Sequence, residues 1–126
     1  MPASASLIPI GATQTANSSG NVAAATAAAT LPAVAGRLNY ITGFSVSGSG
    51  ATLGLPVTVT ITGLLGGTQS YTYCGAAGVL IGNSSLNINF PTPMPASAVN
   101  TAIVVSCPTL GAGNTNNTTN AWGFYE

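Results

Sequence analysis

The chain has 126 residues, and only two of its side chains, Arg37 and Glu126, carry a formal charge at neutral pH. His, Lys and Asp are absent, whereas 46% of the residues are hydrophobic. General acid–base catalysis, nucleophilic catalysis assisted by a base, and zinc or calcium binding all require groups that this composition does not supply. We therefore predict that the protein is not an enzyme and has no catalytic residue, no metal site, no cofactor and no small-molecule substrate.

Size and charge limit the remaining classes of function. A chain of this length fits a single domain, and its high hydrophobicity and zero net charge are the opposite of a disordered composition. One Arg cannot form the basic patch that nucleic acids and anionic membranes attract. No apolar run approaches the roughly 20 residues of a transmembrane helix, and the N-terminus lacks the basic residues that open a signal peptide. We expect a soluble protein without direct nucleic-acid or membrane contact.

The N-terminal part of the chain has the weakest periodicity. Residues 1–21 are rich in Ser, Ala, Thr and Gly and show neither a helical stripe nor sustained alternation. We predict that they form an extended arm ahead of one folded domain at residues 22–126. The Ala-rich segment Val22–Leu31 favours a helix by propensity, but it is too short for a stable helix without packing. We predict a strand there and keep a helix as the alternative.

Alternation of apolar and polar residues begins in the next segment. One parity of residues 38–46 is apolar and should face the core: Leu38, Tyr40, Phe44 and Val46. Ile41 breaks this pattern, so both strand faces should be partly covered. The clearest alternation with polar residues follows: Leu55, Val57, Val59 and Ile61. Gly66-Gly67 separates that run from Thr68–Cys74, which predicts a β-hairpin with Tyr71 and Tyr73 on one face of the returning strand.

The C-terminal third continues the strand pattern. Residues 86–90 alternate, and the three prolines of residues 91–95 should end the ladder because proline has no backbone N–H. Ala102–Cys107 is apolar on both parities, as expected for a central strand covered on both faces. Gly111–Asn117 is typical of a loop, and Trp122 with Phe124 indicates a last strand. Seven or eight short strands predict an all-β fold, an antiparallel β-sandwich of jelly-roll type with an extended N-terminal arm.

Several side chains are candidates for contacts rather than for chemistry. Cys74 and Cys107 lie in separate predicted strands, and we favour two buried free thiols, with a disulfide across the sandwich as the alternative. Arg37 and Glu126 could form an ion pair between subunits; otherwise Arg37 is a solvated residue at a strand start. The aromatic residues are predicted to lie in the core or at a subunit interface, with a sugar platform as the alternative: Tyr40, Tyr71, Tyr73, Trp122, Phe124 and Tyr125.

Four segments carry a family resemblance: Leu31–Phe44, Val57–Gly63, Pro93–Ser97 and Leu110–Asn116. Over roughly Ala23–Glu126 the chain resembles the trimeric cement, or decoration, proteins of tailed-bacteriophage heads, which have a jelly-roll body. The resemblance implies a structural virion protein that binds the outer capsid surface as a homotrimer and stabilises contacts between major capsid subunits, after assembly in the host cytoplasm. The arm would then be a contact with the major capsid protein, through Leu7, Ile8 and Ile10.

Two other functions are compatible with the same composition. A receptor- or carbohydrate-binding β-sandwich module of a phage tail fibre would use exposed aromatic residues. A secreted adhesin-like domain would carry the disulfide and glycans. The uncharged sequence favours the assembly protein, because sheet edges without Lys are hazardous in a free monomer and harmless when buried between subunits.

Overall fold

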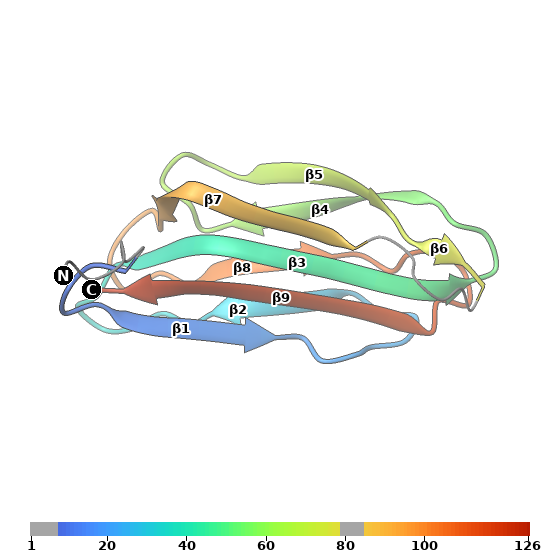
Figure 1. Cartoon of the computed structure of the whole chain (residues 1–126), viewed down its shortest axis with the longest axis horizontal. Coiled ribbons are helices and arrows are strands. Elements are labelled where there is room, and N and C mark those ends of the chain that lie inside the picture. Colours follow the sequence, from blue (N-terminus) through green and yellow to red (C-terminus); the bar gives the residue numbers. More distant parts are fainter. Residues whose placement is uncertain (1–7, 79–84) are drawn as a thin grey trace, which may run out of the picture.

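The computed structural model describes residues 8–78 and 85–126, which form two β-sheets packed face to face (Figure 1). The first sheet has the order β1-β9-β3, with β7 and β6 on the other side of β3; its strands are β1 (Thr13–Ser18), β3 (Asn39–Ala51), β6 (Ala76–Ala77), β7 (Leu86–Pro95) and β9 (Asn116–Tyr125). The second sheet has the order β2-β8-β4-β5; its strands are β2 (Ala27–Leu31), β4 (Pro56–Thr62), β5 (Gln69–Cys74) and β8 (Ile103–Cys107). The all-β prediction is confirmed.

The strands pair in a nested order along the chain. β1 pairs with β9, β2 with β8, β3 with β7 and β4 with β5, all of them antiparallel. The chain therefore runs out to the β4–β5 hairpin and returns beside itself. β6 has only two residues and is the one strand among those described that pairs in parallel, with the end of β3. The predicted hairpin around Gly66-Gly67 is confirmed.

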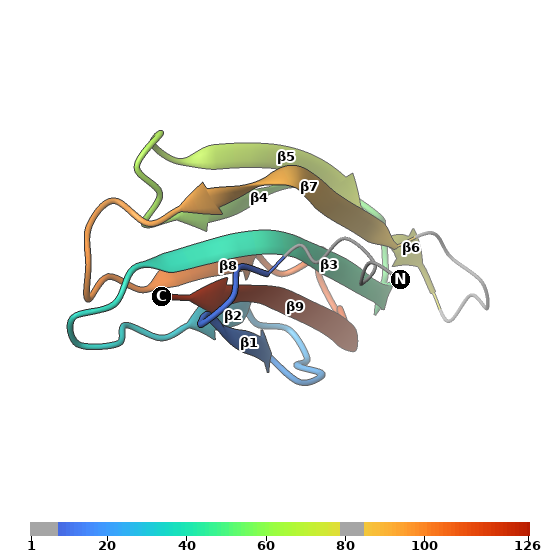
Figure 2. The same cartoon turned by 60° about the vertical axis from the view of Figure 1, so that its left-hand side comes forward.

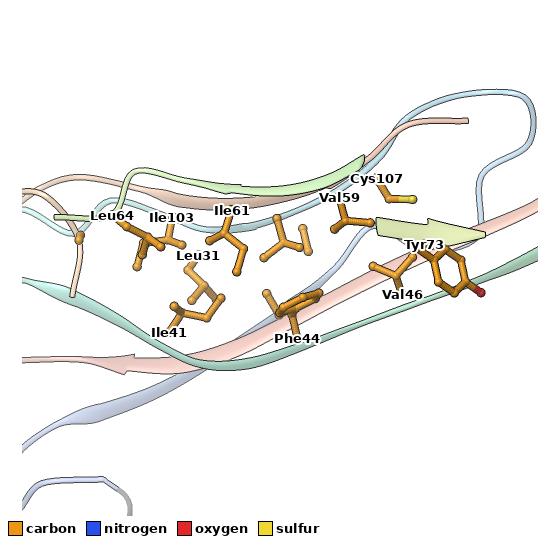
Figure 3. Packing of buried hydrophobic residues seen from close by; sticks show 14 of the residues in the cluster. Leu31, Ile41, Phe44, Val46, Val59, Ile61, Leu64, Tyr73, Ile103 and Cys107 are labelled. Atoms are coloured by element: carbon orange, nitrogen blue, oxygen red, sulfur yellow. The ribbon is translucent and has the colours of Figure 1, made fainter. Parts of the chain in front are cut away.

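The core lies between the two sheets and is built from both (Figure 3). In β2, β4, β8 and β9, alternating residues point inward, as the period-two pattern predicted. Val59 and Ile61 are fully buried, and Tyr73 is nearly so, whereas Leu55 is exposed. The central residues of the cluster come from six strands: Ala29, Leu31, Ile41, Phe44, Val46, Val59, Ile61, Tyr73, Ile103, Val105, Cys107 and Ala121.

A β-bulge in β3 corrects the predicted face of that strand. Between Ile41 and Gly43 the register shifts against both neighbours: Thr42 is an extra residue opposite β9, whereas on the other side the surplus residues, 90–93, belong to β7. The bulge lets Ile41 and Phe44 both point into the core, although they have opposite parity. Tyr40 therefore lies on the outer side, where its ring stacks on that of Phe124 with centroids 4.8 Å apart. The expectation that Tyr40 shares a buried face with Phe44 is wrong, whereas Leu38 is partly buried and packs against the core as expected.

The prolines after Phe90 do not end their strand. β7 continues to Pro95, and pairing with β3 resumes at Met94 after a gap that begins beyond Asn89. The missing N–H groups are tolerated because the register is irregular at this point and β7 has only β3 as a strand neighbour along this stretch. The expectation of a loop from Pro91 onward is therefore wrong.

The Ala-rich segment is a strand in its second half. Ala27–Leu31 forms β2, which pairs along its whole length with β8. Ala27, Ala29 and Leu31 are fully buried. No helix occurs in residues 8–78 or 85–126.

The predicted central strand at Ala102–Cys107 corresponds to β8, which pairs with β2 on one side and β4 on the other. Val104 and Ser106 are only half-buried, so β8 is fully covered on one face and not on both, as had been expected.

The predicted N-terminal arm becomes part of the sheet before residue 21. Thr13–Ser18 pairs with β9 from Tyr125 to Asn120, which makes β1 an edge strand. The Asn17 side chain donates a hydrogen bond of 2.6 Å to the Thr30 carbonyl and so links the edges of the two sheets. Backbone hydrogen bonding to β9 holds Thr13–Ser18 in an extended conformation. The Ser- and Thr-rich sequence of this segment gives no pattern that predicts this pairing. Of the arm, residues 8–12 precede this strand.

Buried asparagines hold the loops at both ends of the sandwich. Asn39 donates to the carbonyls of Pro32 and Thr101, each at 2.9 Å. At the other end the fully buried Asn117 amide lies 3.0 to 3.4 Å from the carbonyl oxygens of Ala25, Cys107 and Pro108. These amides satisfy loop carbonyls that would otherwise be buried without a donor.

Substitution Asn117→Ala should lower the free energy of unfolding by about 2 kcal/mol, because the carbonyls of Ala25, Cys107 and Pro108 lose the hydrogen bonds that the buried amide donates. Urea unfolding followed by circular dichroism measures this change. Asn120→Ala, on the outer side of the same strand, is the control, and its effect should stay near 0.5 kcal/mol. Equal effects of the two substitutions would contradict the role of the buried amide.

Two N-terminal truncations should separate the arm from the sheet. Removal of residues 1–12 should leave the urea midpoint within experimental error of the full chain. Removal of residues 1–20 should lower it clearly, because β9 loses an edge partner and Thr30 loses the Asn17 hydrogen bond. Indistinguishable midpoints for the two truncations would show that β1 does not stabilise the fold.

Candidate interaction surface

The two charged side chains of the protein and several exposed apolar side chains lie at one end of the sandwich. We call it the terminal end and define it by Ile10, Arg37, Leu65, Val99 and Glu126. Leu65 is 67% exposed and Val99 57% exposed. Large apolar residues that are exposed at one end of a domain are candidates for contact with another molecule. Figures 1 and 2 show the C-terminus, the β4–β5 loop and the loop after β7 at this same end.

Backbone hydrogen bonds hold the loops of the terminal end together. The amide of Leu65 donates to the Pro95 carbonyl, and that of Ser97 donates to Gly63. These bonds join the β4–β5 loop to the loop after β7. The amide of Asn100 donates to the Arg37 carbonyl, which ties in the loop before β3. The surface is therefore a fixed arrangement of three loops.

The two charged residues lie next to each other in the fold. Leu38 and Glu126 exchange two backbone hydrogen bonds of 2.9 and 3.1 Å, which places Arg37 one residue from the partner of Glu126. Both side chains are exposed. The predicted ion pair between subunits stays a prediction, and the structure adds that its two members would come from the same surface.

The hydrophobic residues of the expected capsid-contact arm divide into three cases. Leu7 lies outside the described residues. Ile8 is half-buried, whereas Ile10 is as exposed as in an extended chain, at 105%. Ile10 shortly precedes Thr13, which pairs with Tyr125, so it belongs to the terminal end. An isoleucine held fully in water is a candidate contact residue.

The predicted aromatic set separates into core and surface members. Tyr71 and Tyr73 line the core, where Tyr71 lies 5.1 Å from Phe44 between ring centroids. Phe124 is buried beneath Tyr40 on the outer side of the first sheet. Trp122 and Tyr125 are half-buried. The core interpretation therefore holds for Tyr71 and Tyr73, whereas Trp122 remains accessible at the surface.

The sequence analysis did not identify two of the candidate contact residues, Leu65 and Val99. Leu65 follows the buried Leu64 and precedes Gly66-Gly67, so its place at a hairpin tip was the available signal for exposure. Val99 sits in a Ser- and Asn-containing loop without periodicity. The opposite end of the sandwich exposes Leu53 and Leu55 but has neither of the chain's charged residues.

The thiols have different environments. Both cysteines are free; Cys107 is buried and Cys74 is exposed, so the expectation of two buried thiols is wrong for Cys74. Burial raises the pKa of the Cys107 thiol to about 11. Within the described part of the chain, no cluster of His, Cys, Asp and Glu side chains could hold a metal ion. No helix formed by the described residues has the length and apolarity to cross a bilayer.

No protein-family model, curated protein or solved structure matches the chain.

The thiols should react selectively. At pH 8 iodoacetamide should modify Cys74 in the native protein and leave Cys107 unmodified, because Cys107 is buried and its raised pKa disfavours the thiolate. Both should react in urea, and intact mass spectrometry counts the adducts. Equal native labelling of both cysteines would contradict this assignment.

The raised pKa also makes the stability of the fold depend on pH. Cys107 adds to the free energy of unfolding below its unfolded pKa of 9.0, and this added stability is lost as the pH rises toward 11.

Proposed function

We propose that the protein is a structural virion protein, a decoration protein that binds the outside of a tailed-phage head as a homotrimer and stabilises contacts between major capsid subunits. The proposal begins from the sequence resemblance to such cement proteins. The observation that carries it further is the terminal end, where exposed apolar residues and both formal charges meet on a body that has no other charged side chain. Such a surface suits permanent contact with other subunits.

The strand order supports a jelly-roll body. With the two-residue β6 set aside, eight strands pair in the nested order β1–β9, β2–β8, β3–β7 and β4–β5. In a jelly roll, an antiparallel double ribbon of this kind wraps into two four-stranded sheets. The two sheets here have the orders β1-β9-β3-β7 and β2-β8-β4-β5, in agreement with that wrapping.

The near absence of charged side chains favours a protein that works in an assembly over one that stays a free monomer. β5 is an edge strand, Gln69–Cys74, with no charged residue and no proline to discourage pairing with other chains. Free proteins usually guard such edges with Lys or Pro. In a trimer seated on a capsid, contacts with neighbours would cover exposed edges and loops, and the lack of colloidal repulsion would do no harm.

Paired substitutions at the two ends test the contact surface. Leu65→Asn with Val99→Asn should abolish trimers in size-exclusion chromatography with light scattering, or remove binding to capsids that lack the protein, because both contacts lose their apolar surface. Leu53→Asn with Leu55→Asn is the matched control at the opposite end and should change neither. All four side chains are exposed, so both variants should fold.

Quantification of the chain in purified virions tests the role itself. A decoration protein is present in hundreds of copies per particle, and mass spectrometry against a labelled standard measures that number. Absence from virions, or a few copies only, would reject the proposal. A protein that stays monomeric and leaves capsid stability unchanged would reject it as well.

A further inference from the structure

The outer face of the first sheet carries a second surface, unrelated to the terminal end. Cross-strand register places two rows of side chains on this face. One row crosses four strands through Ala16, Trp122, Gly43 and Asn89. The neighbouring row contains only uncharged polar residues and consists of Ser18, Asn120, Ser45 and Asn87.

The indole ring of Trp122 packs over Gly43, its cross-strand neighbour on β3. A Cβ atom built on Gly43 would lie 2.7 Å from both Cε2 and Nε1 of the indole, so the ring occupies the space that any larger residue would fill. Trp122 is half-buried, and its indole N–H has no hydrogen-bond partner in the described part of the chain. A tryptophan in this position combines an accessible aromatic surface with a free donor.

A shallow hollow of about 380 Å³ opens beside the indole, on the side of β1. This volume falls in the range of about 300–1,000 Å³ found for ligand sites. Its rim is held in place, because the Asn17 amide donates to the Thr30 carbonyl and accepts from the Ser18 amide. Six residues line the hollow, and none of them can ionise: Ala16, Asn17, Ser18, Asn120, Ala121 and Trp122.

We propose that this hollow binds a neutral saccharide of one to three sugar units. The C–H face of a pyranose ring packs against an indole, whose π face is electron-rich, while sugar hydroxyls exchange hydrogen bonds with side-chain amides. Asn120 donates to Ser45 at 3.2 Å, which leaves its carbonyl oxygen available as an acceptor. An anionic ligand would meet no cation here, since Arg37, the single cationic side chain, belongs to the terminal end. The site does not depend on the proposed capsid role and could serve attachment of particles to glycans.

The chain has a single tryptophan, so its fluorescence reports on this site alone. Titration of the full-length protein with lactose, maltotriose and N-acetylglucosamine trimer should change Trp122 emission for at least one of them. Sialyllactose should bind no better than lactose. Isothermal titration calorimetry gives the affinity, and no response to any of these probes would overturn the proposal.

Ala16→Leu should reduce affinity at least about tenfold, because it fills the hollow from an exposed edge-strand position without touching the core. Asn120→Ala should reduce it several-fold, the scale of one lost hydrogen bond. Thr13→Leu, also exposed on β1 but outside the hollow, is the matched control and should bind as the unmodified protein does. Equal affinity for the Ala16→Leu variant and the control would overturn the assignment.

A second copy of the chain is the other possible occupant of this face. Acrylamide quenching distinguishes the two, since a saccharide site must stay accessible in the assembled oligomer. Quenching of Trp122 that is unchanged by assembly supports the proposal. Quenching that disappears in the oligomer and returns on dissociation would show that the face is a subunit contact and would overturn it. Loss of trimers or capsid binding alone would affect only the proposed function.

Discussion

The structure depends on supplying hydrogen-bond donors to buried backbone carbonyls without charged side chains. Loops that cross the two ends of a sandwich bring backbone carbonyls into the interior, and each needs a donor. Asn39, Asn114 and Asn117 supply these donors from buried positions. A neutral amide can be buried at a much lower desolvation cost than a Lys or Arg, so a chain almost without charge can still fix its loops. The surfaces formed by those loops then keep a definite shape.

The bulge at Thr42 connects the core to the surface. It changes which side chains of β3 point inward, so that Ile41, Phe44 and Val46 all contribute to the core. The same shift places Gly43 opposite Trp122 on the outer face. A residue with a side chain at position 43 would collide with the indole and with the Ile88 carbonyl. The β-bulge in β3 therefore determines both which side chains of this strand pack in the core and where the ring of Trp122 lies.

The two candidate surfaces differ in chemistry and in position. The terminal end is made of loops, with exposed apolar side chains beside Arg37 and Glu126. The hollow beside Trp122 lies on the outer face of β1 and β9 and is uncharged, with both polar and apolar lining residues. Apolar contact suits lasting association with protein, whereas amides around an indole suit an exchangeable polar ligand. The proposed capsid contact and the proposed saccharide site therefore use separate surfaces of the domain.

The sequence by itself determined the fold class of the protein, all-β, and most of its strands. Strict alternation at Val57–Ile61 and the glycine pair after it specified a hairpin, because period two and turn chemistry are local properties. The scarcity of ionisable side chains likewise led directly to the prediction that the protein is not an enzyme, and this stays a prediction. Tertiary structure decided the rest: that Thr13–Ser18 joins the sheet, that β7 continues through its prolines, and that Tyr40 turns away from the core. Each of these depends on which distant strand lies alongside, and pairing between residues far apart in the chain leaves no local pattern to read. The grouping of Leu65, Val99 and the two charges at one end has the same origin.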